Sequence, residues 1–355
     1  MGGTSCPTRM KKLLNTLFVT TQGTYVSRDG ETVLVKKDHE ILLRVPIHTL
    51  HGIVCFGRVS MSAPLMGFCG ERQVQISFLS ERGEFQARVQ GPVAGNVLLR
   101  REQYRAADDP VRATLATFAI VAAKIANCRT VLLRSMRDNP ETRSAVEAAA
   151  ATLARSLESL SAKRNVGALT VDTLRGVEGD CARAYFGVFD HLILANKGEF
   201  TFQSRSRRPP LDRVNALLSF AYTLLVHDVA GALESVGLDP CVGFLHTDRP
   251  GRPGLALDLM EELRPILADR LVLSLINRQQ VTAKNFTVYE NGSVLMDDAG
   301  RREVLQSWQK RKKEEVMHPF LEETIEIGLF PHVQALLLAR WLRGDLDGYA
   351  ALIWR

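Results

Sequence analysis

Apolar and polar positions alternate with a period near two over the first hundred residues, in short runs separated by polar turns that contain glycine. This period is typical of strands that bury one face. Arg28-Asp29-Gly30 lies between two such runs and predicts a hairpin turn, while residues 60–68 predict one short helix. The predicted strands are residues 13–20, 24–27, 32–36, 41–45, 52–56, 74–79 and 84–90.

From residue 96 onward the period changes to about 3.6, which predicts helices. The clearest follow Pro110 and cover residues 141–163, 171–189 and 212–226, and Asn291-Gly292 predicts one hairpin among them. The predicted fold class is therefore α+β. A β-rich domain over residues 1–95 and a linker helix over 96–109 precede a larger α-helical domain over 110–355, which carries the small β-hairpin.

Residues 242–265 combine a histidine, a stiff turn and two carboxylates. His246 ends an apolar run, and the prolines and glycines of residues 249–254 force a new helix to begin after the turn. Asp258 and Glu261 are three residues apart, so they project from one face of that helix. Oxygen ligands with one imidazole suit Mg²⁺ or Mn²⁺ better than zinc. Taken alone, the plainer alternative is a solvated helix face with His246 hydrogen-bonded at the end of a strand.

The predicted helix at 171–189 carries Glu178 between Gly176 and Gly179. Glycine inside a helix is unfavourable by about 1 kcal/mol relative to alanine, so a close neighbour such as a metal or a DNA backbone is expected there. Tyr185 lies two turns further on and shares the face of Glu178, so it is a candidate contact for DNA. The alternative is a helix crossing that needs small residues, with Glu178 in solvent.

Basic and polar side chains form further candidate contacts for DNA. Arg205, Arg207 and Arg208 precede Pro209-Pro210, and Asn215 and Ser219 share a face of the next helix, where they could equally form a polar notch. The densest basic run is Lys310, Arg311, Lys312 and Lys313, for which a solvated helix face is the alternative to phosphate binding.

Composition adds weaker constraints. The 355 residues carry a formal charge of +6, a modest excess that attracts polyanions such as nucleic acid. The longest charge-free stretches are shorter than the roughly 18 residues that a membrane span needs, and no signal peptide is recognisable, so we expect a cytoplasmic protein with no membrane contact. Six cysteines without a C-x-x-C pair favour reduced, mostly buried thiols.

Four blocks in order, namely Glu178 in its glycine-flanked helix, residues 209–220, His246 after Gly-Phe-Leu, and residues 257–265, resemble the CRISPR-associated integrases of the Cas1 family. The resemblance runs from about Met10 to the end, leaving residues 1–9 outside it, and the tail at 327–349 is most similar to subtype C of the type I systems. It implies a homodimer that acts on double-stranded DNA. It also implies assembly with a Cas2 dimer, and with a further adaptation nuclease, to insert new spacers.

The resemblance assigns the metal ligands of the family to Glu178, His246 and Glu261, with Asp258 as an additional acidic residue and Glu262 outside the set. It implies that Mg²⁺ or Mn²⁺ supports transesterification, in which a 3′ hydroxyl of captured DNA attacks the repeat of a CRISPR array. Arg249, Arg252 and Lys284 are candidates for holding phosphates, although each could be a solvated charge. The alternatives are a stand-alone metal-dependent nuclease and a non-catalytic DNA-binding scaffold.

Overall fold

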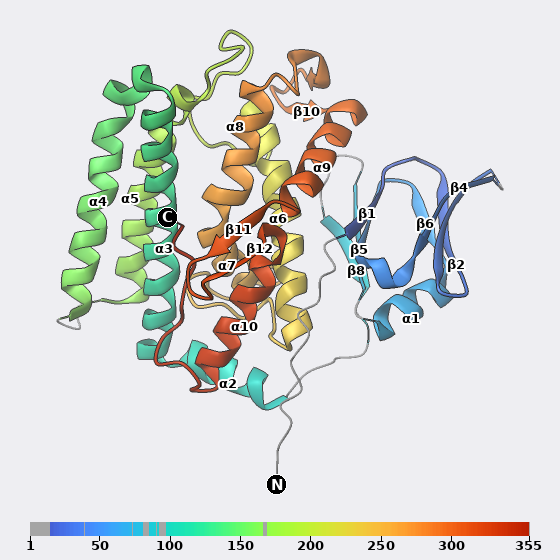
Figure 1. Cartoon of the computed structure of the whole chain (residues 1–355), viewed down its shortest axis with the longest axis horizontal. Coiled ribbons are helices and arrows are strands. Elements are labelled where there is room, and N and C mark those ends of the chain that lie inside the picture. Colours follow the sequence, from blue (N-terminus) through green and yellow to red (C-terminus); the bar gives the residue numbers. More distant parts are fainter. Residues whose placement is uncertain are drawn as a thin grey trace.

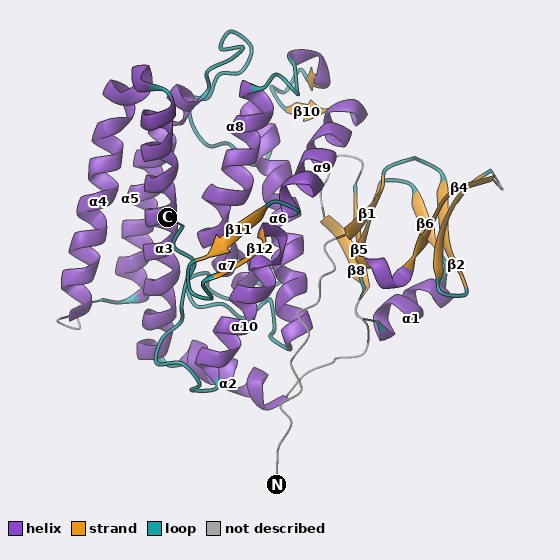
Figure 2. Ribbon diagram, in the orientation of Figure 1, coloured by secondary structure: helices purple, strands orange, loops and turns teal. Residues whose placement is uncertain are grey.

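The computed structural model of the chain describes residues 15–38, 40–72, 74–80, 85–89, 91, 97–165 and 169–354. The predicted extra segment, residues 1–9, lies outside this part. The strands of residues 15–89 cluster at one end of the molecule, and the rest is mainly helical with a few short strands (Figures 1 and 2). The predicted α+β class, with a β-rich N-terminal region followed by a larger helical domain, is confirmed.

The N-terminal region consists of two four-stranded sheets and one helix. One sheet has the order β1-β5-β7-β8, with β1, β5 and β7 parallel and β8 antiparallel to β7. The other has the order β4-β3-β2-β6. The elements are β1 (Asn15–Val19), β2 (Thr24–Asp29), β3 (Thr32–Lys37), β4 (Glu40–Pro46), β5 (Leu50–Phe56), β6 (Val59–Met61), α1 (Ala63–Glu71), β7 (Gln75–Leu79) and β8 (Phe85–Val89).

Local sequence explains where these elements begin and end. Gly30 closes the predicted hairpin between β2 and β3 with a φ of +55°, a conformation that glycine adopts easily. The predicted helix at 60–68 is partly wrong, because residues 59–61 pair with β2 as strand β6. The helix starts only at Ala63, since the side chain of Ser62 caps the N–H of Leu65.

The helical domain is built around two long helices, α3 and α6 (Figure 1). Its helices are α2 (Val97–Asp108), α3 (Pro110–Asp138), α4 (Arg143–Asn165), α5 (Val171–Gly187), α6 (Arg213–Val236), α7 (Gly254–Arg264), α8 (Arg270–Asn277), α9 (Asp298–Lys312) and α10 (Phe330–Leu342). A π-helical turn, Pro265–Asp269, joins α7 to α8. The predicted hairpin is present as β9 (Phe286–Val288) and β10 (Val294–Met296), and the sequence did not predict a second one, β11 (Glu315–His318) and β12 (Glu323–Glu326).

Helix α2, which covers the predicted linker, has one buried face. Leu99, Gln103 and Ala106 are buried, and the amide of Gln103 donates to the carbonyl oxygens of Asp239 and Val242, each at 2.8 Å. The helix therefore packs along one face against the helical domain.

Helices α3 and α6 each contain a window that is long and apolar enough to cross a membrane, but 61% and 72% of those windows are buried inside the protein. Core helices of soluble proteins pass the same test, so these two are explained as the centre of the helical core.

The first sheet packs against α6 and joins the two parts of the chain. The rings of Phe56 and Phe220 lie 6.0 Å apart, and the side chain of Gln75 lies over Gly231, where a Cβ atom would come within 1.8 Å of the Gln75 Oε1. The ring of His227 lies in the same contact, with Nδ1 3.4 Å from the Ser77 hydroxyl.

Burial lowers the pKa of His227 to about 4 from an ordinary value of 6.5. Between these pH values the unfolded chain binds more protons than the folded one, so the free energy of unfolding should fall as pH drops from about 6.5 towards 4, by about 3 kcal/mol at most. When the free energy of unfolding is measured with denaturant at several pH values, it should depend less steeply on pH for His227→Gln than for the wild type. The exposed variant His48→Gln serves as control, and parallel slopes for wild type and His227→Gln would contradict this prediction.

Candidate functional site

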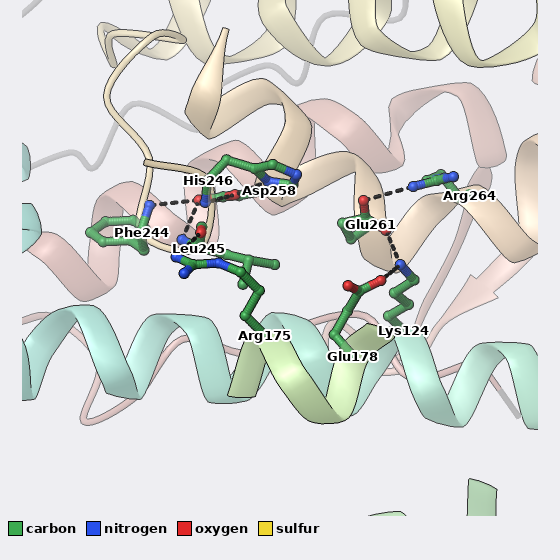
Figure 3. Close-up of polar contacts among 9 residues, drawn as sticks. All are labelled: Lys124, Arg175, Glu178, Phe244, Leu245, His246, Asp258, Glu261 and Arg264. Carbon is green, nitrogen blue, oxygen red and sulfur yellow. Dashed lines mark hydrogen bonds and ion pairs between the residues drawn. The ribbon is translucent and has the colours of Figure 1, made fainter. Parts of the chain in front are cut away.

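The three predicted metal ligands come together at one pocket of about 460 Å³. Glu178 comes from α5, His246 from the loop before α7, and Glu261 from α7 itself (Figure 3). The full lining is Arg175, Glu178, Arg207, Leu245, His246, Thr247, Arg249, Arg252, Leu257, Glu261 and Arg264. Five arginines thus surround two glutamates, which makes the pocket strongly basic around an acidic centre.

A buried ammonium group lies between the two glutamates. Lys124, from α3, contacts the Glu178 Oε1, and its Nζ is 2.6 Å from the Glu261 Oε2. Arg264 pairs with the other oxygen of Glu261 at 2.7 Å (Figure 3). The side chains of Lys124 and Glu261 are 9% and 7% exposed, so these charges are almost completely removed from water.

The cations keep Glu261 ionised. Burial raises the pKa of its carboxyl group, but the charges of Arg264 and Lys124 outweigh burial and hold the pKa at about 2. Glu261 is therefore negatively charged near neutral pH, and a positive group is needed close to it because the carboxylate is buried.

Asp258 holds the loop that carries His246. Its carboxylate accepts hydrogen bonds from the backbone N–H groups of Phe244, Leu245 and His246 at 2.6, 2.9 and 3.0 Å, and it lies 2.6 Å from the His246 Nδ1. These contacts leave Nε2 as the ring nitrogen that has no partner among the described residues. Asp258 thus acts as a positioning residue rather than facing the pocket, whose lining does not include it.

Two glycines allow the loop to approach α7 this closely. A Cβ atom at Gly243 would lie 2.7 Å from the Asp258 Oδ2, and one at Gly254 would lie 2.7 Å from the carbonyl oxygen of Cys241. The plainer alternatives for this stretch are wrong in two respects. Asp258 and Glu261 are buried rather than solvated, and His246 lies in a loop rather than at the end of a strand.

The predicted helix crossing at Gly176 and Gly179 is also wrong, because a Cβ atom at either position would meet nothing within 4 Å. The backbone of α5 beside Glu178 is therefore uncovered by the described part of the protein. This leaves room for a ligand to approach the helix.

Several predicted DNA contacts lie where DNA could reach them. Arg207, Arg249 and Arg252 line the pocket, and Arg208 and Lys284 are exposed outside its lining. Lys310 and Lys313 are exposed on α9 and just after it.

Other predicted contacts are committed to internal bonds. Tyr185 is 1% exposed and donates to Asp269 at 3.1 Å, which argues against contact with DNA. Arg205 donates to Asn215 and Ser219 at 2.5 and 3.1 Å, so these three form a polar network beside the pocket.

The basic run on α9 is divided in the same way. Lys312 is buried, and its Nζ donates to the Asp228 Oδ2 at 2.9 Å. Arg311 donates to the carbonyl oxygen of Ile266 at 2.7 Å and pairs with Glu314. Neither a uniformly solvated face nor a four-residue phosphate site describes this run.

Sequence reasoning missed three cations at the centre of the site: Lys124, Arg175 and Arg264. Arg264 was visible three residues after Glu261, the spacing of an ion pair on one helix. Arg175 precedes Glu178 by the same spacing. Lys124 gave no signal, because it ends a charge-free stretch in a helix remote from the other site residues.

The protein offers two carboxylates and an imidazole around a position that already holds a cation. As they stand, no three His, Cys, Asp or Glu side chains in the described part of the chain form a group that could hold a metal ion. Since Lys124 lies between Glu178 and Glu261, the spacing of this pair suits a single cation, and a bound metal would have to replace the ammonium. The donor set is therefore compatible with a divalent metal that competes with Lys124.

Known structures share this fold. A casposase bound to its integration product aligns with a TM-score of 0.82 at 22% identity, covering 96% of this chain and 94% of that one. A chain of a Cas6-RT-Cas1–Cas2 complex aligns with a TM-score of 0.79 at 22% identity, covering 96% of this chain and 36% of that one. At these identities the likeness concerns the fold, that of proteins with a strand-rich N-terminal region and a helical domain.

Sequence comparison identifies the family within this fold. The family model for the CRISPR associated protein Cas1 matches residues 17–310. The CRISPR-associated endonuclease Cas1 1 of Chlorobaculum tepidum is 52% identical over 347 residues, covering 98% of this chain and all of the relative. The chain belongs to the Cas1 family of CRISPR-associated endonucleases, which confirms the resemblance.

Replacing Asp258 by alanine should lower the free energy of unfolding by about 3 kcal/mol, because three backbone donors, two of them buried, and the His246 ring lose their acceptor. Urea unfolding measures this change. Asp248→Ala alters an exposed carboxylate of the same loop and should stay within about 0.5 kcal/mol of the wild type. Equal stability of the two variants would show that Asp258 does not hold the loop.

Proposed function

We propose that this protein joins the 3′ hydroxyl ends of captured DNA to the repeat of a CRISPR array by metal-dependent transesterification. The observation that carries the proposal is the convergence of Glu178, His246 and Glu261 on one pocket with a rim of arginines. Membership of the Cas1 family and the shared fold with a casposase support it.

Transfer of a phosphodiester needs two things that this pocket can supply. Negative charge on the nonbridging oxygens must be neutralised, and the attacking and leaving oxygens must be held in line. Arg207, Arg249 and Arg252 come from two loops that border the pocket, so their guanidinium groups can bind the phosphates of a DNA strand from separate sides.

The metal-ligand set would be Glu178, His246 through Nε2, and Glu261, while Asp258 orients the imidazole through Nδ1. A divalent ion held there, Mg²⁺ or Mn²⁺, would polarise the phosphoryl oxygen and lower the pKa of the attacking hydroxyl. Arg264 would stay paired with Glu261 and keep that carboxylate ionised and oriented.

The reaction conserves the number of phosphodiester bonds. The 3′ oxygen of the captured fragment loses its proton and forms a bond to phosphorus. The bond from that phosphorus to a 3′ oxygen of the repeat strand breaks, and the leaving oxygen takes up a proton. Water in place of the 3′ hydroxyl would give hydrolysis, so DNA cleavage is an expected side reaction.

The proposed assembly is a homodimer with a Cas2 dimer and a further adaptation nuclease, in the cytoplasm. The Cas1–Cas2 complexes among the structures of this fold support the Cas2 partner. The edge strand β4 exposes Ile41, Leu42 and Leu43, with relative exposures of 43%, 50% and 44%. Such an apolar sheet edge supports contact with a second copy of the chain.

Glu178→Ala should lower the rate at which a 3′-hydroxyl DNA fragment is joined to a supercoiled plasmid that carries the repeat by at least about 100-fold. Cas2 and Mg²⁺ or Mn²⁺ are present in the assay. The assay measures branched product on a gel. Asp180→Asn serves as the matched control, because it alters an exposed carboxylate two residues along α5 that pairs with Arg183.

Full joining by Glu178→Ala would remove this residue from the reaction. Cleavage without joining by the wild type would favour a stand-alone nuclease. DNA binding with neither reaction would favour a non-catalytic scaffold.

A further inference from the structure

A second basic pocket, of about 230 Å³, shares no lining residue with the candidate site. It lies between the C-terminal half of α3, the start of α8 and the end of the chain, which runs back beside α3 (Figure 1). Its lining is Thr130, Val131, Leu133, Arg134, Arg137, Ile266, Arg270 and Trp354, a set without any carboxylate.

Arg270 is the central observation. It is partly buried, and in the described part of the chain it forms no hydrogen bond or ion pair. Its guanidinium carbon lies 5.8 Å from the centre of the Trp354 ring. Burial, together with the nearby positive charges of Arg311 and Arg134, lowers its pKa to about 10, against a smaller opposing effect of Glu314 and Asp138.

The surrounding acidic groups are already used. Asp138 pairs with both Arg134 and Arg137, at 3.4 and 3.0 Å. Glu314 pairs with Arg311 at 3.0 Å. Four arginines therefore lie near two carboxylates, and each of these carboxylates is paired with an arginine other than Arg270. Guanidinium groups held close together repel one another, and an anion among them relieves that repulsion.

The tail is fixed in place, which makes the pocket a built feature. Asn127 on α3 donates to the carbonyl oxygen of Leu352 at 2.8 Å and accepts from the N–H of Trp354 at 2.7 Å. Thr130 donates to the carbonyl oxygen of Trp354 at 3.3 Å. The indole of Trp354 therefore forms a fixed wall beside the guanidinium groups.

We propose that this pocket binds a phosphate of a DNA backbone, at a place separate from the reacting phosphodiester. Arginines from two different helices approach the pocket, and a tetrahedral phosphate can accept from several directions, whereas a carboxylate accepts in one plane. The adjoining indole offers a flat surface for a sugar or base. The inference rests on the proposed function, because joining two DNA molecules requires phosphate contacts outside the reacting pocket.

Arg270→Gln should weaken binding of a fluorescein-labelled DNA duplex, measured by anisotropy in EDTA so that no reaction occurs. The expected loss is about fivefold at low salt, and the slope of log affinity against log salt should become shallower by about one, as for one lost phosphate contact. Arg134→Gln should act in the same direction. Arg343→Gln, at an exposed position paired with Asp345 outside both pockets, should leave the slope unchanged.

Thermal unfolding without DNA separates this role from a structural one. Because Arg270 forms no hydrogen bond or ion pair with the described residues, Arg270→Gln should keep or raise the melting temperature, whereas a loss of several degrees together with weaker binding would indicate a structural role and overturn the proposal. A wild-type salt slope for Arg270→Gln, with the wild type still binding and joining DNA, would overturn this inference alone. Absence of DNA binding by the wild type would overturn the proposed function as well.

A comparison of two polyanions of equal charge tests the class of ligand. An oligothymidylate should raise the melting temperature of the wild type more than that of Arg270→Gln, and a polyglutamate of equal charge should not discriminate between them. Discrimination by polyglutamate instead would show a docking site for an acidic protein segment, and the proposal would be wrong.

Discussion

The ion pairs of Lys124 with Glu178 and Glu261 are the interaction on which the candidate site depends. They join α3, α5 and α7, three helices that are far apart in the sequence. Two carboxylates that face one another in a pocket with little water would repel strongly, so the pair persists only with a cation between them. In this structure the cation is the ammonium group of Lys124, which contacts both carboxylates.

Helix α7, which carries Glu261, is held in place by contacts of its other polar side chains. Arg264 pairs with Glu261 and lies 4.2 Å above the ring of Tyr222, whose hydroxyl donates to Asp269 at 2.6 Å. On another face of α7, Glu262 accepts from Tyr349 and from the N–H of Leu352, so the end of the chain is fastened to the same helix. The expectation that Glu262 lies outside the ligand set agrees with this placement. Because Arg264 and Glu262 are both held by these contacts, α7 can present Glu261 in one orientation.

Periodicity was sufficient for the fold class, since the change from a period of two to 3.6 depends only on which residues are apolar. The boundaries that failed, such as β6 at Val59–Met61, depend on pairing with a strand about 35 residues away. At the site, the spacing of Asp258 and Glu261 predicted that they lie on one face of a helix. It did not predict that both are buried or that they have separate roles. Those roles follow from the loop at 244–246, whose N–H groups surround Asp258 and leave Glu261 to the pocket. Lys124 could not be predicted, because a lysine in the middle of a largely apolar helix has no local pattern that indicates its partners.

The most direct test of this account is the affinity of Mn²⁺ for the wild type and for Lys124→Met, measured by calorimetry together with the melting temperature. If the ammonium occupies the cation position, Lys124→Met should unfold at a lower temperature without metal, bind Mn²⁺ at least about tenfold more tightly, and gain more thermal stability from it than the wild type. The double variant Lys124→Met with Glu178→Gln should lose that gain. Equal or weaker Mn²⁺ binding by Lys124→Met, with the fold intact, would contradict a cation site shared by the lysine and the metal.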